Sequence, residues 1–155
     1  MKRYKTLLMV LAAIILFCGI TIGKGTGTII GLMYSPAIML KGFSSIWGGA
    51  SFLSQTALLG ELCGALGAVL WSAAMFFRYA KKKALWRDLV WGAWWGGLSS
   101  AASSALFALS LHFLSEGTSF VNVLFFEFAY GILFWMLLGL GGGAILAIIR
   151  SKTSS

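Results

Sequence analysis

Residues Phe52–Phe77 read FLSQTALLGELCGALGAVLWSAAMFF, an apolar run that contains one acidic side chain, Glu61. A membrane-spanning helix needs about 20 mostly apolar residues, so this run is long enough to cross a bilayer. Around Glu61, the segment GELCGALG places small residues at helical spacing. Small residues let two helices approach closely in lipid, where contact packing drives association. The run therefore predicts a transmembrane helix whose Glu61 side chain faces a neighbouring helix and not lipid.

The whole chain has the composition of a membrane protein. Of its 155 residues, 59% are hydrophobic and 10% are charged, whereas soluble domains are about 45–50% apolar and about 25% charged. Three further runs are long enough to cross a bilayer. We therefore expect an all-α integral membrane protein, a single polytopic domain over residues 1–155. Its four transmembrane helices are expected at about 6–22, 52–77, 89–113 and 121–149.

Lysine and arginine set the expected orientation. They concentrate on the cytoplasmic side of a membrane, and with four spans the three basic clusters of this chain fall on one side. The clusters are Lys2, Arg3 and Lys5; Arg78, Lys81, Lys82, Lys83 and Arg87; and Arg150 and Lys152. Both ends and the basic loop 78–88 are therefore expected in the cytoplasm, as in a bacterial inner-membrane protein.

The same cations predict a lipid partner. Basic residues beside membrane helices attract anionic headgroups, so the net charge of +8 does not indicate nucleic-acid binding. Headgroup contact is expected at Arg78, Lys81, Lys82, Lys83 and Arg87.

The expected outer loop, 23–51, contains a second apolar stretch, 27–43, interrupted by Pro36. A fifth full span there would place a basic cluster outside, so four spans fit the charges better. We expect a short interfacial or re-entrant segment; the alternatives are a surface loop with an apolar patch or a segment that lines a pore. The first run follows basic residues as a secretory signal does, but no A-x-A cleavage site follows it. We expect it to remain as an uncleaved helix, although cleavage would leave the same orientation.

Three ionisable side chains are candidates for binding a proton or a cation: Glu61, Glu127 and His112. A carboxylate inside a membrane has a high free-energy cost, so we expect it to be paired with a cation, protonated or hydrated. Structural roles remain open for each. Glu61 can pair with Lys24 or Lys41, Glu127 can sit at a helix start where the macrodipole favours an anion, and His112 can lie at the interface.

A stripe of small and hydroxylated residues follows one face of the third expected helix. Its polar members are Ser99, Ser100, Ser103 and Ser110. They are candidates for a polar path toward the Glu61 level, with Phe107 as its constriction. The alternative is that these hydroxyls only hold helices together, at about 0.6 kcal/mol each.

Glycine pairs four residues apart predict tight helix packing. They are Gly60 and Gly64, Gly92 and Gly96, and Gly139 and Gly143. Such pairs in three helices indicate a tightly packed bundle, and some of these faces are candidates for contact with a second copy or another membrane protein. Four tryptophans, Trp86, Trp91, Trp94 and Trp95, suit the headgroup level; a ligand cage is the alternative. Cys18 and Cys63 are expected to be small packing residues.

No motif for nucleotide binding, metal-dependent hydrolysis or serine hydrolysis occurs, so we expect no enzyme, cofactor or metal site. Two functions remain open. The first is a small permeation component, oligomeric, that binds protons or cations at intramembrane carboxylates. The second is a non-catalytic membrane subunit that anchors or assembles a larger complex.

Overall fold

The computed structural model describes residues 2–39, 52–79, 85–114 and 119–152, and these form four helices. The helices are α1 (Lys2–Met39), α2 (Phe52–Tyr79), α3 (Leu85–Leu114) and α4 (Phe120–Ser151). Each contains a stretch long and apolar enough to cross a membrane. Over these ranges the protein therefore has the all-helical character and the four candidate spans of an integral membrane protein.

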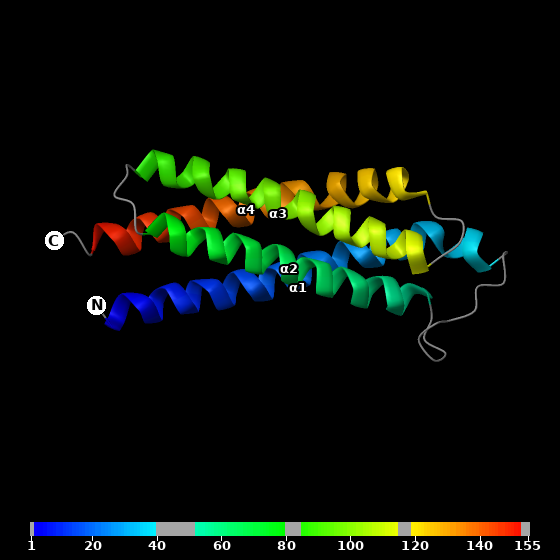
Figure 1. The fold of residues 1–155 in the computed structure, drawn as a ribbon, viewed down its shortest axis with the longest axis horizontal. Helices are drawn as coiled ribbons and strands as arrows, with labels where there is room; N and C mark the ends of the chain where they lie inside the picture. The colour runs from blue at the N-terminus through cyan, green and yellow to red at the C-terminus, as the bar shows by residue number, and fades with distance from the viewer. Residues whose placement is uncertain (1, 40–51, 80–84, 115–118, 153–155) are drawn as a thin grey trace.

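The helices run alternately in opposite directions and form a four-helix bundle (Figure 1). α1 packs along α2 and α3 packs along α4, while the two hairpins touch through α1–α4 and α2–α3 contacts. Both termini lie at one end, together with the end of α2 and the start of α3; we call this the terminal end. The opposite end, where α1 and α3 finish and α2 and α4 begin, is the loop end.

The expected outer loop 23–51 is wrong for residues 23–39. These residues are helical, because α1 continues without a break to Met39. In lipid every backbone polar group needs an internal partner, so a continuous helix is preferred to an open loop even where glycines are frequent. Pro36 lies in the last turn of α1 and removes one hydrogen bond there. The residues 40–51, with Lys41, lie outside the described residues.

The connection between α2 and α3 is also shorter than the predicted basic loop 78–88. α2 continues to Tyr79 and α3 begins at Leu85, so Arg78 and Asp88 are both helical. Asp88 lies in the first turn of α3, where the positive end of the helix dipole favours a carboxylate. The other expected helix boundaries differ from the observed ones by two residues or fewer at the start of α2, the end of α3 and both ends of α4.

Charged side chains bracket the apolar middle of the bundle at two levels. At about 1.5 Å per residue, Lys5 and Lys24 are about 28 Å apart along α1, and Glu61 and Arg78 are about 26 Å apart along α2. The hydrocarbon core of a bilayer is about 30 Å thick. The two separations are slightly shorter than this thickness, and the candidate spans continue past Lys24 to Tyr34 and begin before Glu61 at Phe52. The Lys24–Glu61 level therefore lies within the candidate spans.

Glycines bring the helices of each hairpin into backbone contact. A Cβ on Gly23 would overlap the carbonyl oxygen of Gly60, and a Cβ on Gly60 would overlap that of Gly23. Gly92 and Gly139 have the same reciprocal relationship between α3 and α4. All six glycines expected at helix contacts are used inside the chain: Gly60, Gly64, Gly92, Gly96, Gly139 and Gly143.

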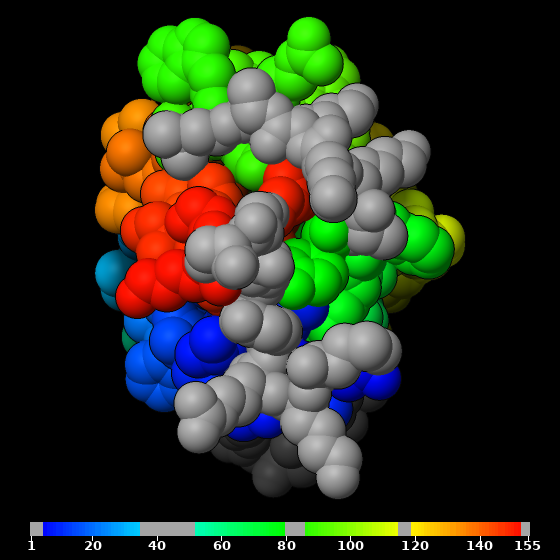
Figure 2. Space-filling model, turned by 90° about the vertical axis from the view of Figure 1, so that its left-hand side faces the viewer, coloured from blue at the N-terminus to red at the C-terminus, as the bar shows by residue number. Residues whose placement is uncertain are grey.

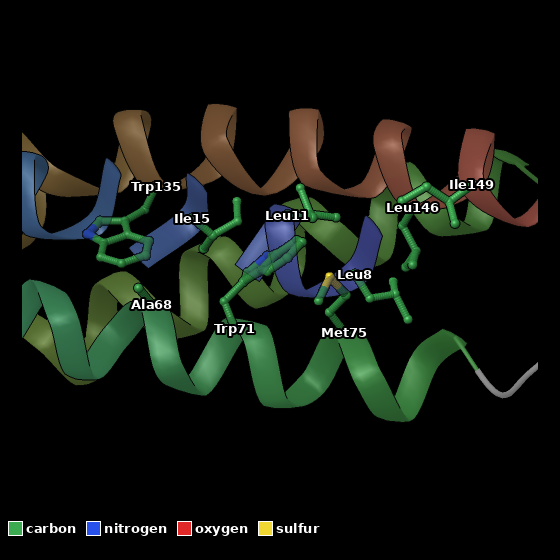
Figure 3. Close-up of a cluster of buried hydrophobic side chains, with 9 residues drawn as sticks. All are labelled: Leu8, Leu11, Ile15, Ala68, Trp71, Met75, Trp135, Leu146 and Ile149. Carbon is green, nitrogen blue, oxygen red and sulfur yellow. The ribbon is translucent and has the colours of Figure 1, made fainter. Parts of the chain in front are cut away.

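The interior of the bundle has two hydrophobic clusters with a polar layer between them. The cluster toward the terminal end includes Trp71, Trp135, Leu11 and Ile15 (Figure 3). The cluster toward the loop end includes Ile30, Phe107, Val123 and Cys63. Between the two clusters, the buried polar side chains are Thr26 on α1, Ser99, Ser100, Ser103 and Ser104 on α3, and Glu127 on α4. Apolar side chains therefore separate this layer from both ends.

Candidate functional site

Two residues of α1 bind the two intramembrane acids, which lie on different sides of the bundle. Lys24 forms an ion pair with Glu61 of α2, whereas Thr26 donates a hydrogen bond to Glu127 of α4. The two carboxylates therefore have separate partners and do not share one site.

The Lys24–Glu61 pair lies at the outside of the bundle. The Lys24 Nζ and Glu61 Oε1 atoms are 2.8 Å apart, and the two side chains are 61% and 29% exposed. Glu61 thus pairs with a residue of the neighbouring helix α1, one of the two lysines that the sequence offered, although its side chain is partly exposed at the outside of the bundle. An exposed ion pair of this kind links α1 to α2 but contributes little to stability. Because the two charges balance each other, the pair leaves little net charge for binding another ion.

Glu127 is buried, with 3% of the residue exposed. Its Oε1 accepts a hydrogen bond from the Thr26 hydroxyl at 2.6 Å. Its other oxygen, Oε2, has no hydrogen-bond partner among the described residues. In the part of the chain that the structure describes, the cations at membrane depth are engaged elsewhere, since Lys24 binds Glu61 and Arg78 binds Asp88. A carboxyl group in this position needs a proton or a bound cation to balance it.

Ser100 lies close to the turn of α4 that follows Glu127. The position where a Cβ on Gly131, one turn along α4 from Glu127, would lie is 3.4 Å from the Ser100 Oγ and 3.8 Å from the Thr26 Cγ2. The Oγ atoms of Ser99 and Ser100 are buried and have no hydrogen-bond partner among the residues described. Buried polar groups are nearly always hydrogen-bonded in proteins. Three buried oxygens of the polar layer, Ser99 Oγ, Ser100 Oγ and Glu127 Oε2, thus lack a hydrogen-bond partner among the described residues.

The Thr26 hydroxyl can serve either protonation state of Glu127. It lies 2.6 Å from Glu127 Oε1 and 3.1 Å from the carbonyl oxygen of Gly23, and a hydroxyl carries one proton and two lone pairs. When Glu127 is ionised, Thr26 donates to the carboxylate. When Glu127 is protonated, the carboxylic acid donates to Thr26, and Thr26 donates to Gly23. Proton binding therefore needs only a hydroxyl rotation.

The other candidate residues fall in different places. His112 is exposed near the loop end of α3, with its ring 5.9 Å from that of Phe113. Ser99, Ser100 and Ser103 are buried, and Ser110 is half-buried. The expected stripe thus includes the polar layer, and Phe107, fully buried, closes it toward the loop end. The structure places Ser99, Ser100 and Ser103 in the same buried layer as Glu127 and leaves Glu61 partly exposed outside this layer.

Sequence reasoning missed a buried charge cluster at the terminal end. Asp88 is 1% exposed and accepts from two arginines: Arg78 Nε donates to Oδ1 at 3.0 Å and Arg150 Nη1 donates to Oδ2 at 2.6 Å. Arg150 Nη2 also donates to the carbonyl oxygen of Arg78 at 3.0 Å. The cluster joins α2, α3 and α4. The sequence did contain a signal for this cluster, because Asp88 is the single acidic residue in the basic stretch 78–88.

A group of three tryptophans borders this cluster through Trp91. The Arg78 guanidinium lies 5.8 Å from the ring centroid of Trp91, a cation–π distance. Trp91 in turn lies against Trp71 and Trp95, at 5.9 and 6.2 Å between ring centroids. Trp71 Nε1 donates to the carbonyl oxygen of Gly92 at 3.2 Å. Of the expected headgroup contacts, Arg78 is thus buried, Arg87 is exposed, and Lys81, Lys82 and Lys83 lie outside the described residues.

Both cysteines are free thiols, Cys18 half-buried and Cys63 buried. Over the described ranges, no group of three or more His, Cys, Asp or Glu residues is placed to hold a metal ion. No protein family matches this chain, and no curated protein or solved structure is significantly similar to it.

Proposed function

We propose that this protein is a small permeation component of a membrane and that Glu127 is the group that binds the transported proton or cation. The observation that carries the proposal is the buried Glu127 carboxyl group, which has a hydroxyl donor on one oxygen and no partner among the described residues on the other. Intramembrane acids without a counter-charge mark proton and ion pathways in membrane proteins.

Because Glu61 already has a partner, we assign ion binding to Glu127 and not to Glu61. Glu61 is balanced by Lys24, whereas Glu127 is not balanced by any described cation. Thr26 supports binding and release because its hydroxyl accepts from the acid or donates to the carboxylate. The arrangement of apolar clusters on both sides supports an occluded state, which opens to one side at a time during transport.

The experiment is a flux assay in liposomes. The purified protein is reconstituted with a pH-sensitive dye inside, and proton entry is followed under a potassium diffusion potential set with valinomycin, then with sodium and potassium gradients. We expect Glu127→Gln to reduce flux at least tenfold, because glutamine keeps the shape but cannot release a proton. Glu61→Gln is the matched control, the same chemical change at the paired acid, and is expected to keep most of the flux.

Three outcomes would contradict the proposal. They are wild-type liposomes that pass neither protons nor these cations, equal flux in wild type and Glu127→Gln, and equal losses in both variants. Circular dichroism and size-exclusion profiles of each variant separate loss of transport from loss of folding.

The alternative, a non-catalytic anchor or assembly subunit, loses part of its support. All six glycines that were candidates for docking pack inside the chain, so a partner would have to bind another surface. Crosslinking with mass spectrometry in native membranes distinguishes the two functions: constant recovery with one other protein, together with no flux, favours the subunit.

We further propose that the terminal end faces the cytoplasm of a bacterial cell. Each of the three basic clusters has described cations at this end, namely Lys5, Arg78, Arg87, Arg150 and Lys152, whereas Lys24 belongs to the other level. Short loops rich in Lys and Arg remain inside. Cysteines introduced at Lys5 and at Val121 can be labelled from outside with an impermeant maleimide. Labelling at Val121 and not at Lys5 is the expected result, and the reverse pattern would invert the orientation.

A further inference from the structure

Two grooves meet at Arg78, close to the terminal end of the bundle. The larger has a volume of about 490 Å³ and lies between α2 and α3, with Leu70, Phe77 and Trp95 among its apolar walls. The smaller has a volume of about 360 Å³ and is bordered by Trp86, Arg87 and Trp94. Arg78 and Trp91 line both grooves.

The described charged residues that line the two grooves are arginines. Arg78 lines both grooves and Arg87 lines the smaller one, and no carboxylate is among the described residues that line either groove. The Nε atom of Arg78 donates a hydrogen bond to Asp88, and the Arg78 guanidinium group lies over the ring of Trp91. Arg87, exposed, adds a further cation at the edge of the smaller groove. The junction is therefore positive, and a bound anion would balance it.

We propose that these grooves seat one anionic phospholipid, with an acyl chain in the larger groove and the phosphate between Arg78 and Arg87. The shape of the site fits an amphiphile, since apolar walls run along the bundle and end at a cationic tip. Its depth also fits, because Arg78 lies at the end of a candidate span and tryptophans border the headgroup level. Guanidinium groups bind phosphate oxygens with paired hydrogen bonds. The proposal does not depend on the role of Glu127.

Figure 2 faces the terminal end and shows the red end of α4 between the blue start of α1 below it and the green start of α3 at the top. Lys5 belongs to the start of α1, on the far side of α4 from the start of α3. It is exposed like Arg87, so Lys5→Gln removes the same charge from the same end of the protein without touching the grooves. This makes it the matched control for Arg87→Gln.

The test is native mass spectrometry of delipidated protein in detergent, titrated with dioleoyl phosphatidylglycerol or with dioleoyl phosphatidylcholine. We expect one phosphatidylglycerol to bind at least fivefold more tightly than phosphatidylcholine. Arg87→Gln should weaken phosphatidylglycerol binding about fivefold, which corresponds to about 1 kcal/mol per basic residue near an anionic surface, and Lys5→Gln should leave it unchanged. Arg78 itself stays intact, because it holds Asp88.

A second pair of variants tests the acyl-chain groove. Ala73→Phe fills the larger groove, which Ala73 lines, and should weaken binding of both lipids. Ala129→Phe makes the same change at an exposed position of α4 and should not. Equal affinity for the two lipids, equal losses in Arg87→Gln and Lys5→Gln, or full binding by Ala73→Phe would each overturn the proposal. Competition by soluble glycerophosphoglycerol at equal affinity would also overturn it, because the groove would then contribute nothing.

Discussion

Gly23 on α1 and Gly60 on α2 contact each other backbone to backbone, and the carbonyl oxygen of each fills the place where a Cβ on the other would lie. The same reciprocity joins Gly92 to Gly139. Each hairpin of the bundle is therefore built around a glycine contact that no larger residue can replace without moving a helix.

Replacing Gly23 by alanine should destabilise the protein by about 1–3 kcal/mol, the usual effect of forcing extra atoms into a packed contact. Gly25, two residues further along α1, has open space around it, so Gly25→Ala should change stability by less than about 0.5 kcal/mol. The free energy of unfolding in mixed micelles measures both variants. Equal effects would mean that the α1–α2 contact is looser than the structure shows.

Asp88→Asn should destabilise the protein by about 3–5 kcal/mol, because removing one partner of a buried ion pair leaves uncompensated charge. Here two guanidiniums would lose the carboxylate that they share. Adding Arg150→Met should restore part of the loss, since it removes one of the two guanidiniums that Asp88 binds. The measurement is a double-mutant cycle on the free energy of unfolding, with the exposed Arg87→Gln as control; simple additivity would contradict the shared cluster.

Thr26→Val keeps the shape of the side chain and removes the hydroxyl that Glu127 uses. We expect a loss of about 1–3 kcal/mol in stability, the penalty for leaving a buried polar group without its partner. Thr21→Val is the matched control, because Thr21 is exposed and donates only to the carbonyl oxygen of Phe17 within the same helix. In the Glu127→Leu background, where no carboxyl group remains, Thr26→Val should cause a smaller loss of stability. An equal loss in both backgrounds would mean that Thr26 and Glu127 do not interact.

The Lys24–Glu61 pair should contribute little to stability. Partly exposed ion pairs are usually worth about 0–1 kcal/mol, and 61% of the Lys24 side chain is exposed. A double-mutant cycle with Lys24→Gln and Glu61→Gln should give a coupling free energy below about 1 kcal/mol. A coupling above about 2 kcal/mol would show that the pair is shielded from solvent in the membrane and would return Glu61 to the candidate site.

The sequence by itself determined the number of spans and the residues that let helices meet closely. Hydropathy and spacing along one helix are local properties, so four apolar runs predicted four helices, and glycines four residues apart predicted the contact faces. The same local reasoning went wrong at residues 23–39, because glycine and proline indicate a loop in water, whereas a helix in lipid keeps its hydrogen bonds.

Only the tertiary structure decided which charged groups meet. Lys24 and Thr26 are two residues apart on α1, yet the helix turns them to different neighbours, so Glu61 receives a cation and Glu127 a hydroxyl. Asp88 is buried only because the ends of α2 and α4 bring Arg78 and Arg150 to it. These pairings depend on the rotation and relative height of the helices. Both are set by backbone contact between distant segments, such as Gly23 with Gly60, and by no pattern within a single segment.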